Sequence, residues 1–241
     1  MNEKIEQLKE QLTDSQKIVF FGGAGVSTAS GIPDFRSSKG LYFQDTKTQV
    51  SAEEMISHTF YKRHPKEFFK YYFENLVYED AEPNEAHDFL KELEDQGKDV
   101  HIVTQNIDGL HQKAGSTKVH ELHGSVLRNY CTKCNTSYSI EELELDDDGI
   151  PRCPADDAIV RPDIVLYEEG LDQNVIQQAI DAIQTADMLM IAGTSLVVYP
   201  AAGLINYFNG DYLVAINKSS IRVPDNTLLF EDSIANVFEK L

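Results

Sequence analysis

The sequence predicts an α/β fold in which a parallel β-sheet is covered on both faces by helices. Short apolar runs have the length of strands buried on both sides, at residues 17–21, 100–104, 188–192 and 212–216, with a shorter run at 228–230. Amphipathic stretches separate them, at residues 84–96, 172–185 and 233–241. Strands and helices that alternate in this way indicate a parallel sheet with crossover helices.

The composition is that of an acidic globular protein. Of its 241 residues, 41% are hydrophobic and 10% are aromatic, so the chain can form a buried core and is not expected to be disordered. The net charge of −19 repels nucleic-acid phosphates and anionic lipids, and it favours basic partners such as Lys-rich protein segments. Three cysteines are too few for a disulfide scaffold. We therefore expect no nucleic-acid and no membrane partner.

Two segments bear on where the protein acts. Residues 1–15 alternate charges with Ile5, Leu8 and Leu12 at helical spacing, and so lack the apolar core of a signal peptide. Residues 188–208 carry no charge, but small and polar residues interrupt them, so we interpret them as a buried strand, a turn and a packed helix rather than a membrane span. We expect a cytoplasmic protein, and the sequence leaves its oligomeric state open.

Two regions interrupt the alternation of strands and helices. Residues 37–83 are rich in Phe and Tyr and are typical of a helical insertion, and residues 125–161 carry all three cysteines. We expect both to form a small domain, while residues 1–36, 84–124 and 162–241 form the domain with the sheet. Ligands of open parallel sheets bind beyond the carboxyl ends of the strands. The loops at residues 22–36, 105–111, 193–201 and 217–220 should therefore share the site.

The first of these loops is the richest in functional signals. Gly22, Gly23 and Gly25 directly follow a predicted strand, where glycine lets the backbone approach a phosphate and a following helix presents free amides. The spacing matches neither common phosphate-binding glycine motif, so a tight turn without a ligand remains an alternative. That alternative leaves residues 33–36 (Pro-Asp-Phe-Arg) unexplained, because they place an acid, an aromatic ring and a guanidinium at the site edge.

Two further motifs follow. Residues 104–111 read Thr-Gln-Asn-Ile-Asp-Gly-Leu-His, and their amides and carboxylate could bind ribose hydroxyls or a carboxamide; a polar turn without a ligand is the alternative. Residues 121–124 read Glu-Leu-His-Gly. His123 titrates near neutral pH and could act as a general base, although a lone histidine is more often structural.

These three motifs, in this order, closely resemble those of the sirtuin family of NAD-dependent protein deacylases. The resemblance continues through residues 161–165 (Arg-Pro-Asp-Ile-Val), 193–195 (Gly-Thr-Ser), 200–202 (Pro-Ala-Ala) and 216–217 (Ile-Asn), and it covers the chain from about Ile18 onward. It implies a Rossmann-like domain that binds NAD, and a small domain made of a helical module and a zinc-ribbon-like module. Acyl-lysine would enter the cleft between the two domains.

The resemblance also assigns site residues. It implies NAD contacts by Ala24, Gly25, Ser27, Thr28, Asp34, Phe35 and Arg36, by Gln105, Asn106, Ile107, Asp108 and His123, and by Gly193, Thr194, Ser195, Asn217 and Ile234. It implies that Ile164, Val165, Leu166 and Tyr167 pair as a strand with the substrate peptide.

By the same resemblance, the activity is removal of acetyl or other neutral acyl groups from lysine, with release of nicotinamide and O-acetyl-ADP-ribose. His123 would be the general base that activates a ribose hydroxyl, while Asn106 and Asp108 orient nicotinamide and water. Asn75 stands where family members that remove acidic acyl groups carry an arginine, which favours neutral groups. Mono-ADP-ribosyl transfer at the same NAD site is the alternative activity, and a non-catalytic NAD sensor is a further one.

The zinc motif departs from the family pattern. Cys131 and Cys134 form a first half and Cys153 begins a second, but Asp156 stands where the fourth cysteine is expected. Structural zinc sites prefer Cys and His, although carboxylates can also bind zinc. Three interpretations remain open: a Cys131, Cys134, Cys153 and Asp156 site, weak binding by three thiolates, or a module that folds without metal.

Overall fold

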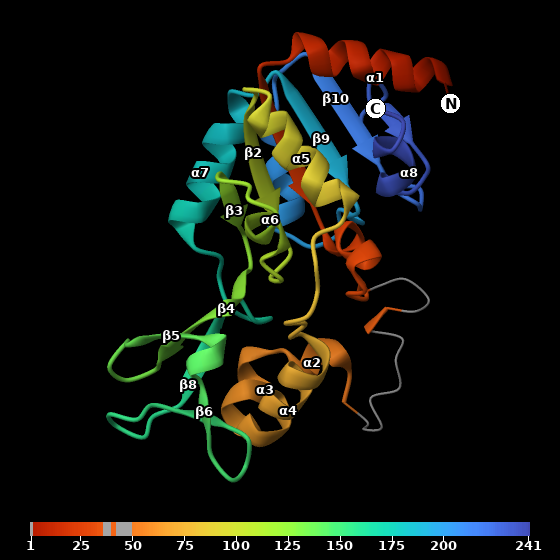
Figure 1. Cartoon of the computed structure of the whole chain (residues 1–241). Coiled ribbons are helices and arrows are strands. Elements are labelled where there is room, and N and C mark those ends of the chain that lie inside the picture. The colour runs from red at the N-terminus through yellow and green to blue at the C-terminus, as the bar shows by residue number, and fades with distance from the viewer. Residues whose placement is uncertain (1, 36–39, 42–49) are drawn as a thin grey trace.

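The core of the protein is a six-stranded, all-parallel sheet in the order β11-β10-β9-β1-β2-β3, seen in the upper half of Figure 1. The computed structural model describes residues 2–35, 40–41 and 50–241. The sheet strands are β1 (Lys17–Gly22), β2 (Asp99–Thr104), β3 (Val119–Glu121), β9 (Met188–Ala192), β10 (Tyr212–Ile216) and β11 (Leu228–Phe230). All five predicted strands are confirmed to within one residue, and β3 is the one that the sequence did not reveal.

Helices cover both faces of this sheet, as predicted. On one face, Ile18 and Phe20 of β1 pack with buried residues of α1 (Asn2–Asp14), α5 (Glu85–Asp95) and α8 (Ile234–Phe238). On the other face, Val19 and Phe21 pack with α7 (Gln173–Gln184) and the 3-10 helix η5 (Ala201–Tyr207). Successive side chains of a strand point to opposite faces, so a continuous apolar run such as β1 requires a cover on each side.

Capping side chains determine where several helices begin. The Asn84 side chain accepts a hydrogen bond from the Ala86 N–H at the start of α5, and Asp172 accepts from two N–H groups at the start of α7. These side chains satisfy amides that have no partner within the first turn of a helix. The predicted helices at residues 84–96 and 172–185 are thus confirmed with their flanking cap residues included.

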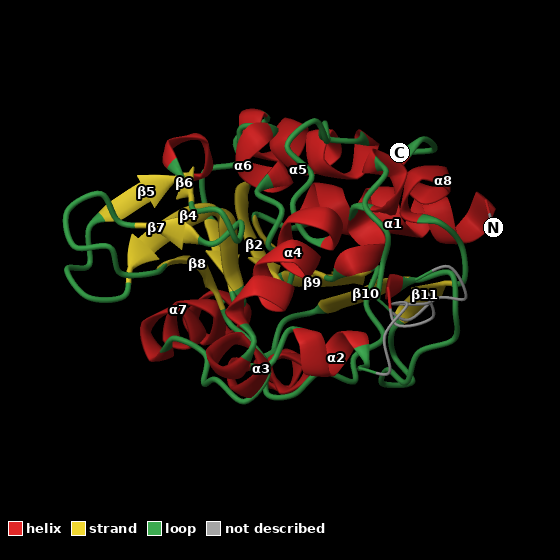
Figure 2. Cartoon of the chain, turned by 90° about the horizontal axis from the view of Figure 1, so that it is seen from below, coloured by secondary structure: helices red, strands yellow, loops and turns green. Residues whose placement is uncertain are grey.

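Most of the remaining elements form a smaller part of the molecule, which lies below the sheet in Figure 1; Figure 2 views the molecule from that side. Its helices are α2 (Ala52–Met55), α3 (His58–Arg63) and α4 (Pro65–Asn75). The rings of α3 and α4 form an aromatic core that includes Tyr61, Phe68 and Tyr72. An antiparallel sheet in the order β5-β4-β8 joins Ser137–Ser139, Gly124–Cys131 and Val160–Ile164, and the strands β6 (Glu144–Leu145) and β7 (Pro151–Arg152) pair beside it. The 3-10 helix η4 (Ile140–Glu142) follows β5.

The helical module and the cysteine-bearing module share one core. Val126 of β4, Ile164 of β8 and Leu166 belong to the same buried cluster as the aromatic residues of α3 and α4. The arrangement fits the expected small domain, and Figure 1 shows it at the carboxyl edge of the large sheet.

One expectation about local structure is wrong and another is confirmed. The segment after Gly23 does not enter a regular α-helix but forms two short 3-10 turns, η1 (Ala24–Val26) and η2 (Thr28–Ser30). The packed helix expected after β9 is present as the 3-10 helix η5. Within the described ranges, no helix combines the length and the apolar character needed to cross a bilayer.

Candidate functional site

The backbone of the first glycine loop packs directly on the loop after β9. The Gly25 N–H donates to the Gly193 carbonyl over 2.8 Å, and the Gly23 N–H donates to the Ala192 carbonyl over 3.2 Å. A Cβ on Gly25 would lie 2.7 Å from the Gly193 Cα, and Gly193 has a φ of 59°. The close approach therefore requires glycine, and it leaves a backbone-lined edge suited to a phosphate.

Ser27 connects this loop to the second motif. Its buried hydroxyl donates to Asp108 Oδ2 over 2.6 Å and accepts from Asn106 Nδ2 over 3.0 Å. Asp108 Oδ1 also accepts from the Leu110 N–H at the start of α6 (Leu110–Lys113). The three predicted site residues form one hydrogen-bonded cluster at the carboxyl ends of β1 and β2.

Gln105 and Thr194 join the ends of β2 and β9. Gln105 Nε2 donates to Thr194 Oγ1 over 3.1 Å, and Thr194 Oγ1 in turn accepts from the Leu196 N–H. Thr104, which the sequence analysis did not single out, accepts from the Asn106 N–H with its hydroxyl over 3.0 Å. It anchors the backbone of the second motif at its first residue.

The geometry of His123 identifies the nitrogen that can act as a base. His123 Nδ1 lies 2.9 Å from the Gln105 carbonyl oxygen. A carbonyl oxygen only accepts, so Nδ1 carries the proton and Nε2 of the neutral ring keeps its lone pair. Burial lowers the pKa of His123, and the hydrogen bond to Gln105 opposes that shift only in part. The ring is therefore neutral at physiological pH and ready to accept a proton.

Gly124 lets the strand that carries His123 approach its neighbour. A Cβ on Gly124 would lie 1.9 Å from the Asp163 carbonyl oxygen, and the residue has a φ of 75°. No other residue fits this position, which brings β4 against β8 beside the histidine.

Two buried histidines lie together at the second motif: His111 is the last residue of that motif, and His87 of α5 was not singled out from the sequence. The rings of His87 and His111 lie 4.7 Å apart, and His111 is only 1% exposed. Burial lowers the pKa of His111 to about 3, so its ring is neutral. Asn84 Nδ2 donates to the Val26 carbonyl and to Ser30 Oγ, while the Asn84 N–H donates to His87 Nδ1. Asn84 thus ties α5 to the first loop.

The other predicted cofactor residues occupy several settings. Thr28 Oγ1 donates to the Gly25 carbonyl, the Asp34 carbonyl accepts from the Leu41 N–H, and Phe35 packs against the aromatic core. Ala24 lies in η1, and Ile107 packs against the aromatic core. Ser195 is exposed, and the Asn217 side chain donates to Ser219. Ile234 is buried in the core between the sheet and the helices α1, α5 and α8. Arg36 lies outside the described residues.

The stretch at residues 164–167, predicted to pair with the substrate peptide, belongs to a strand of the chain only at its first residue. Ile164 is the last residue of β8, and the strand does not continue. The N–H groups of Val165 and Tyr167 donate to the carbonyls of His123 and Ile56, and the Leu166 N–H donates to the Glu169 carboxylate. The backbone donors of residues 165–167 thus have partners within the chain. Their role in peptide binding stays a prediction.

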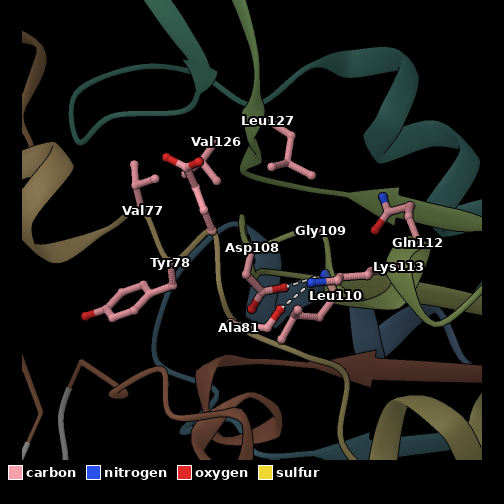
Figure 3. Close-up of a pocket in the computed structure, with 11 residues that line it drawn as sticks. Val77, Tyr78, Ala81, Asp108, Gly109, Leu110, Gln112, Lys113, Val126 and Leu127 are labelled. Atoms are coloured by element: carbon pink, nitrogen blue, oxygen red, sulfur yellow. Dashed lines mark hydrogen bonds between the residues drawn. The ribbon is translucent and has the colours of Figure 1, made fainter. Parts of the chain in front are cut away.

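A cavity of about 330 Å³ borders Asp108 on the side of the small domain. Figure 3 shows it between Val77 and Tyr78, the 108–113 segment, and Val126 and Leu127 of β4. Lys113 Nζ donates to the Ala81 carbonyl at its rim. The cavity lies where the helical module, β4 and the second motif meet, so its walls come from both predicted domains.

The three cysteines and Asp156 come together as predicted. One ligand atom from each of Cys131, Cys134, Cys153 and Asp156 can be chosen so that all lie within 4.8 Å of one another. The Cys134 and Cys153 sulfurs are 3.7 Å apart, close to the roughly 3.8 Å expected between two thiolates on a tetrahedral zinc ion. The donor set fits a structural zinc site with one carboxylate ligand.

The fold and the glycine-lined edge define a nucleotide-binding protein of the Rossmann-like α/β class. Comparison with known proteins then identifies the family. The Sir2 family model matches residues 23–200. A Clostridium perfringens protein named NAD-dependent protein deacetylase is 56% identical over 243 residues, covering 100% of this chain and 99% of that protein. The chain belongs to the Sir2 family.

Two solved structures show the same fold with ligands. A Sir2 variant described with a deacetylated p53 peptide and 3'-O-acetyl ADP ribose is 34% identical, with a TM-score of 0.88 over 98% of this chain and 96% of that one. A Sir2 structure described with a p53 peptide and NAD+ is 35% identical, with a TM-score of 0.85 and the same coverage.

Proposed function

We propose that this chain is an NAD-dependent protein-lysine deacetylase that removes acetyl or other neutral acyl groups and releases nicotinamide and O-acetyl-ADP-ribose. Its membership of the Sir2 family and its likeness to full-length relatives named as deacetylases support this function. The solved relatives described with peptide, NAD+ and an acetylated ADP-ribose support the same chemistry. Acetyl-lysine proteins or peptides are the proposed partners.

The observation that carries the proposal is the hydrogen bond from His123 Nδ1 to the Gln105 carbonyl. It fixes the tautomer whose Nε2 accepts a proton, and burial keeps the ring neutral. A deacetylase requires such a base to activate a ribose hydroxyl. The backbone N–H of Val165 donates to the His123 carbonyl, so the proposed peptide segment starts beside the base.

NAD, when bound, supplies an anomeric carbon from which nicotinamide leaves and to which the acyl oxygen adds. The Ser27 bridge holds Asn106 and Asp108 in fixed positions, from which their side chains would orient nicotinamide and water. We assign NAD contacts to the predicted residues of the first loop, the second motif and the loop after β9. Phe35, packed against the aromatic core, would help exclude water from the reacting centre.

Zinc is the proposed structural metal. Cys131, Cys134, Cys153 and Asp156 would hold it and thereby join the turn after β4 to the segment after β7. Such a site stabilises a module that has few buried residues of its own, because Cys131, Cys153 and Val160 are the buried hydrophobic residues of this cluster.

Two further assignments belong to the same proposal. We assign residues 1–36, 84–124 and 162–241 to the NAD-binding domain and residues 37–83 and 125–161 to the small domain. The separate cores of the sheet and of the aromatic helices support two domains, but Ile164 and Leu166 pack in the aromatic core, so the last range begins with residues that contact the small domain. We also assign the protein to the cytoplasm, where its three unpaired cysteines would remain reduced and able to bind metal.

Mass spectrometry of an acetyl-lysine peptide incubated with the protein, with and without NAD, tests the proposal. Loss of the acetyl group only with NAD, together with nicotinamide and acetylated ADP-ribose, is the expected result. Nicotinamide release with an unchanged acetyl peptide would contradict deacetylation and point to ADP-ribosyl transfer.

A further inference from the structure

Glu168 has a backbone conformation that is unusual for its residue type. Its φ is 76°, in the left-handed region that favours glycine. The Glu169 N–H donates to the Leu166 carbonyl, so residues 166–169 form a turn with Glu168 at its third position. A glutamate in a conformation where glycine would be unstrained points to a use for its side chain.

The Glu168 carboxylate is held in place and remains exposed. The Thr59 N–H and the Thr59 hydroxyl both donate to its Oε2, over 2.8 and 2.7 Å. These two bonds lower the pKa of the carboxyl, so it is negatively charged at neutral pH. No cation among the described residues forms an ion pair with it within 4.0 Å, although Arg63 and His58 lie near enough to influence it.

The position of Glu168 relative to His123 places it beside the proposed peptide path. Val165 is hydrogen-bonded to the backbone of His123, and Glu168 follows three residues later, at most about 11 Å along the chain. The side chains of Ile164 and Leu166 point into the core, whereas Tyr167 is 37% exposed next to Glu168. An acetyl-lysine that reaches His123 would therefore bring a residue within about three positions of it close to Glu168.

We propose that Glu168 is a specificity determinant that favours substrates with Lys or Arg close to the acetyl-lysine. The inference rests on the proposed deacetylase function and adds a substrate class to it. The fixed carboxylate supplies a local negative charge at the peptide segment, and the overall charge of −19 attracts the same basic sequences over longer range.

Peptides that differ at one position test this proposal. Arginine is placed in turn at each of the three positions on either side of acetyl-lysine, and glutamine at the same position gives the neutral reference. The ratio of kcat/KM for the arginine peptide to that for the glutamine peptide is measured for the natural chain and for Glu168→Gln. We expect the ratio at one position to fall about two- to fivefold, the factor of a solvent-exposed ion pair.

Two variants separate the effect of the Glu168 charge from its structural role in holding the start of α3. A role confined to the start of α3 would need only a hydrogen-bond acceptor for Thr59, which glutamine also supplies. Glu144→Gln, which removes an exposed carboxylate on β6, is the matched control and should leave every ratio unchanged. Equal ratios in the natural chain and Glu168→Gln would overturn the proposal, as would an arginine preference spread evenly over all six positions.

Peptide affinity, measured by fluorescence anisotropy without NAD, tests the role of Glu168 separately from the proposed deacetylase activity. If no peptide loses its acetyl group, the deacetylase assignment fails. The affinity ratio between arginine and glutamine peptides still reports whether Glu168 recognises a basic residue. An unchanged affinity ratio in Glu168→Gln would refute the role of Glu168 by itself.

Discussion

At the scale of single residues, the partner of one ring nitrogen determines what His123 can do. Because Nδ1 is committed to the Gln105 carbonyl, Nε2 is the nitrogen that can accept a proton. We expect His123→Ala to reduce NAD-dependent deacetylation by at least about 10²-fold, the usual contribution of a general base. Thermal stability and NAD affinity should change little. His64→Ala, which removes an exposed histidine of the helical module, is the control. Full turnover by the His123 variant would remove it from the mechanism.

A second prediction for a single residue concerns Ser27, whose hydroxyl is hydrogen-bonded to both Asp108 and Asn106. Ser27→Ala would leave Asp108 Oδ2 and Asn106 Nδ2 without their shared partner in a buried site. We expect a loss of about 1–3 kcal/mol in the free energy of unfolding and a lower kcat, measured by urea denaturation and by nicotinamide release. Ser116→Ala is the matched control, since the Ser116 hydroxyl is buried and has no hydrogen-bond partner among the residues that the structure describes. Equal effects of the two substitutions would show that the bridge contributes nothing.

At the scale of elements, the cysteine module depends on how well Asp156 replaces a thiolate. Zinc prefers four sulfur or nitrogen ligands in structural sites, so Asp156→Cys should tighten metal binding. We expect the variant to retain zinc at chelator concentrations that strip the natural chain, and to melt at a higher temperature, as measured by metal analysis and calorimetry.

A substitution that removes the carboxylate ligand tests the same metal site in the opposite direction. Asp156→Ala should lower zinc content, because only three ligands remain. If the natural chain already holds one zinc per molecule and Asp156→Cys gains nothing, Asp156 is an adequate ligand. If none of the three proteins binds zinc, the module folds without metal.

The individual strands and turns show which elements could be predicted from the sequence. Strands such as β9 and β10 were predicted with their observed bounds, because burial on both faces produces an uninterrupted apolar run. The strand β3 was missed because it has three residues, all half-buried, and no apolar run. The 3-10 turns after Gly23 were missed because glycine and serine spacing specifies a turn but not its hydrogen-bond pattern.

For the site, motif order indicated most of the residues that the fold brings together. The cluster of Ser27, Asn106 and Asp108 unites loops that are about 80 residues apart in sequence, as predicted. The backbone donors of residues 165–167 could not be foreseen, since their partners lie in other elements. His87 looks like an ordinary helix residue in sequence, and only packing reveals that it lies buried beside His111 of the second motif.

At the scale of the whole molecule, these buried histidines make folding stability depend on pH. Burial lowers the pKa of His87, His111 and His123 in the folded state, that of His111 to about 3. In the unfolded chain each would titrate near 6.5. Above that pH the three rings are neutral in both the folded and the unfolded state, so their protonation does not change the free energy of unfolding. Below it the unfolded chain binds protons that the folded chain does not, so the free energy of unfolding falls as pH falls.

Each such histidine contributes a slope of up to about 1.4 kcal/mol per pH unit below 6.5, until its folded pKa is reached. Glu169, whose pKa is held near 2 chiefly by its bonds with Arg161 and His58 against the effect of burial, adds a loss only below about 4.5. Between pH 6.5 and 5 the histidines should therefore dominate. Urea denaturation at several pH values should show His111→Leu losing less stability per pH unit than the natural chain. Parallel slopes for the two proteins would mean that His111 is protonated, or exposed to water, in the folded state.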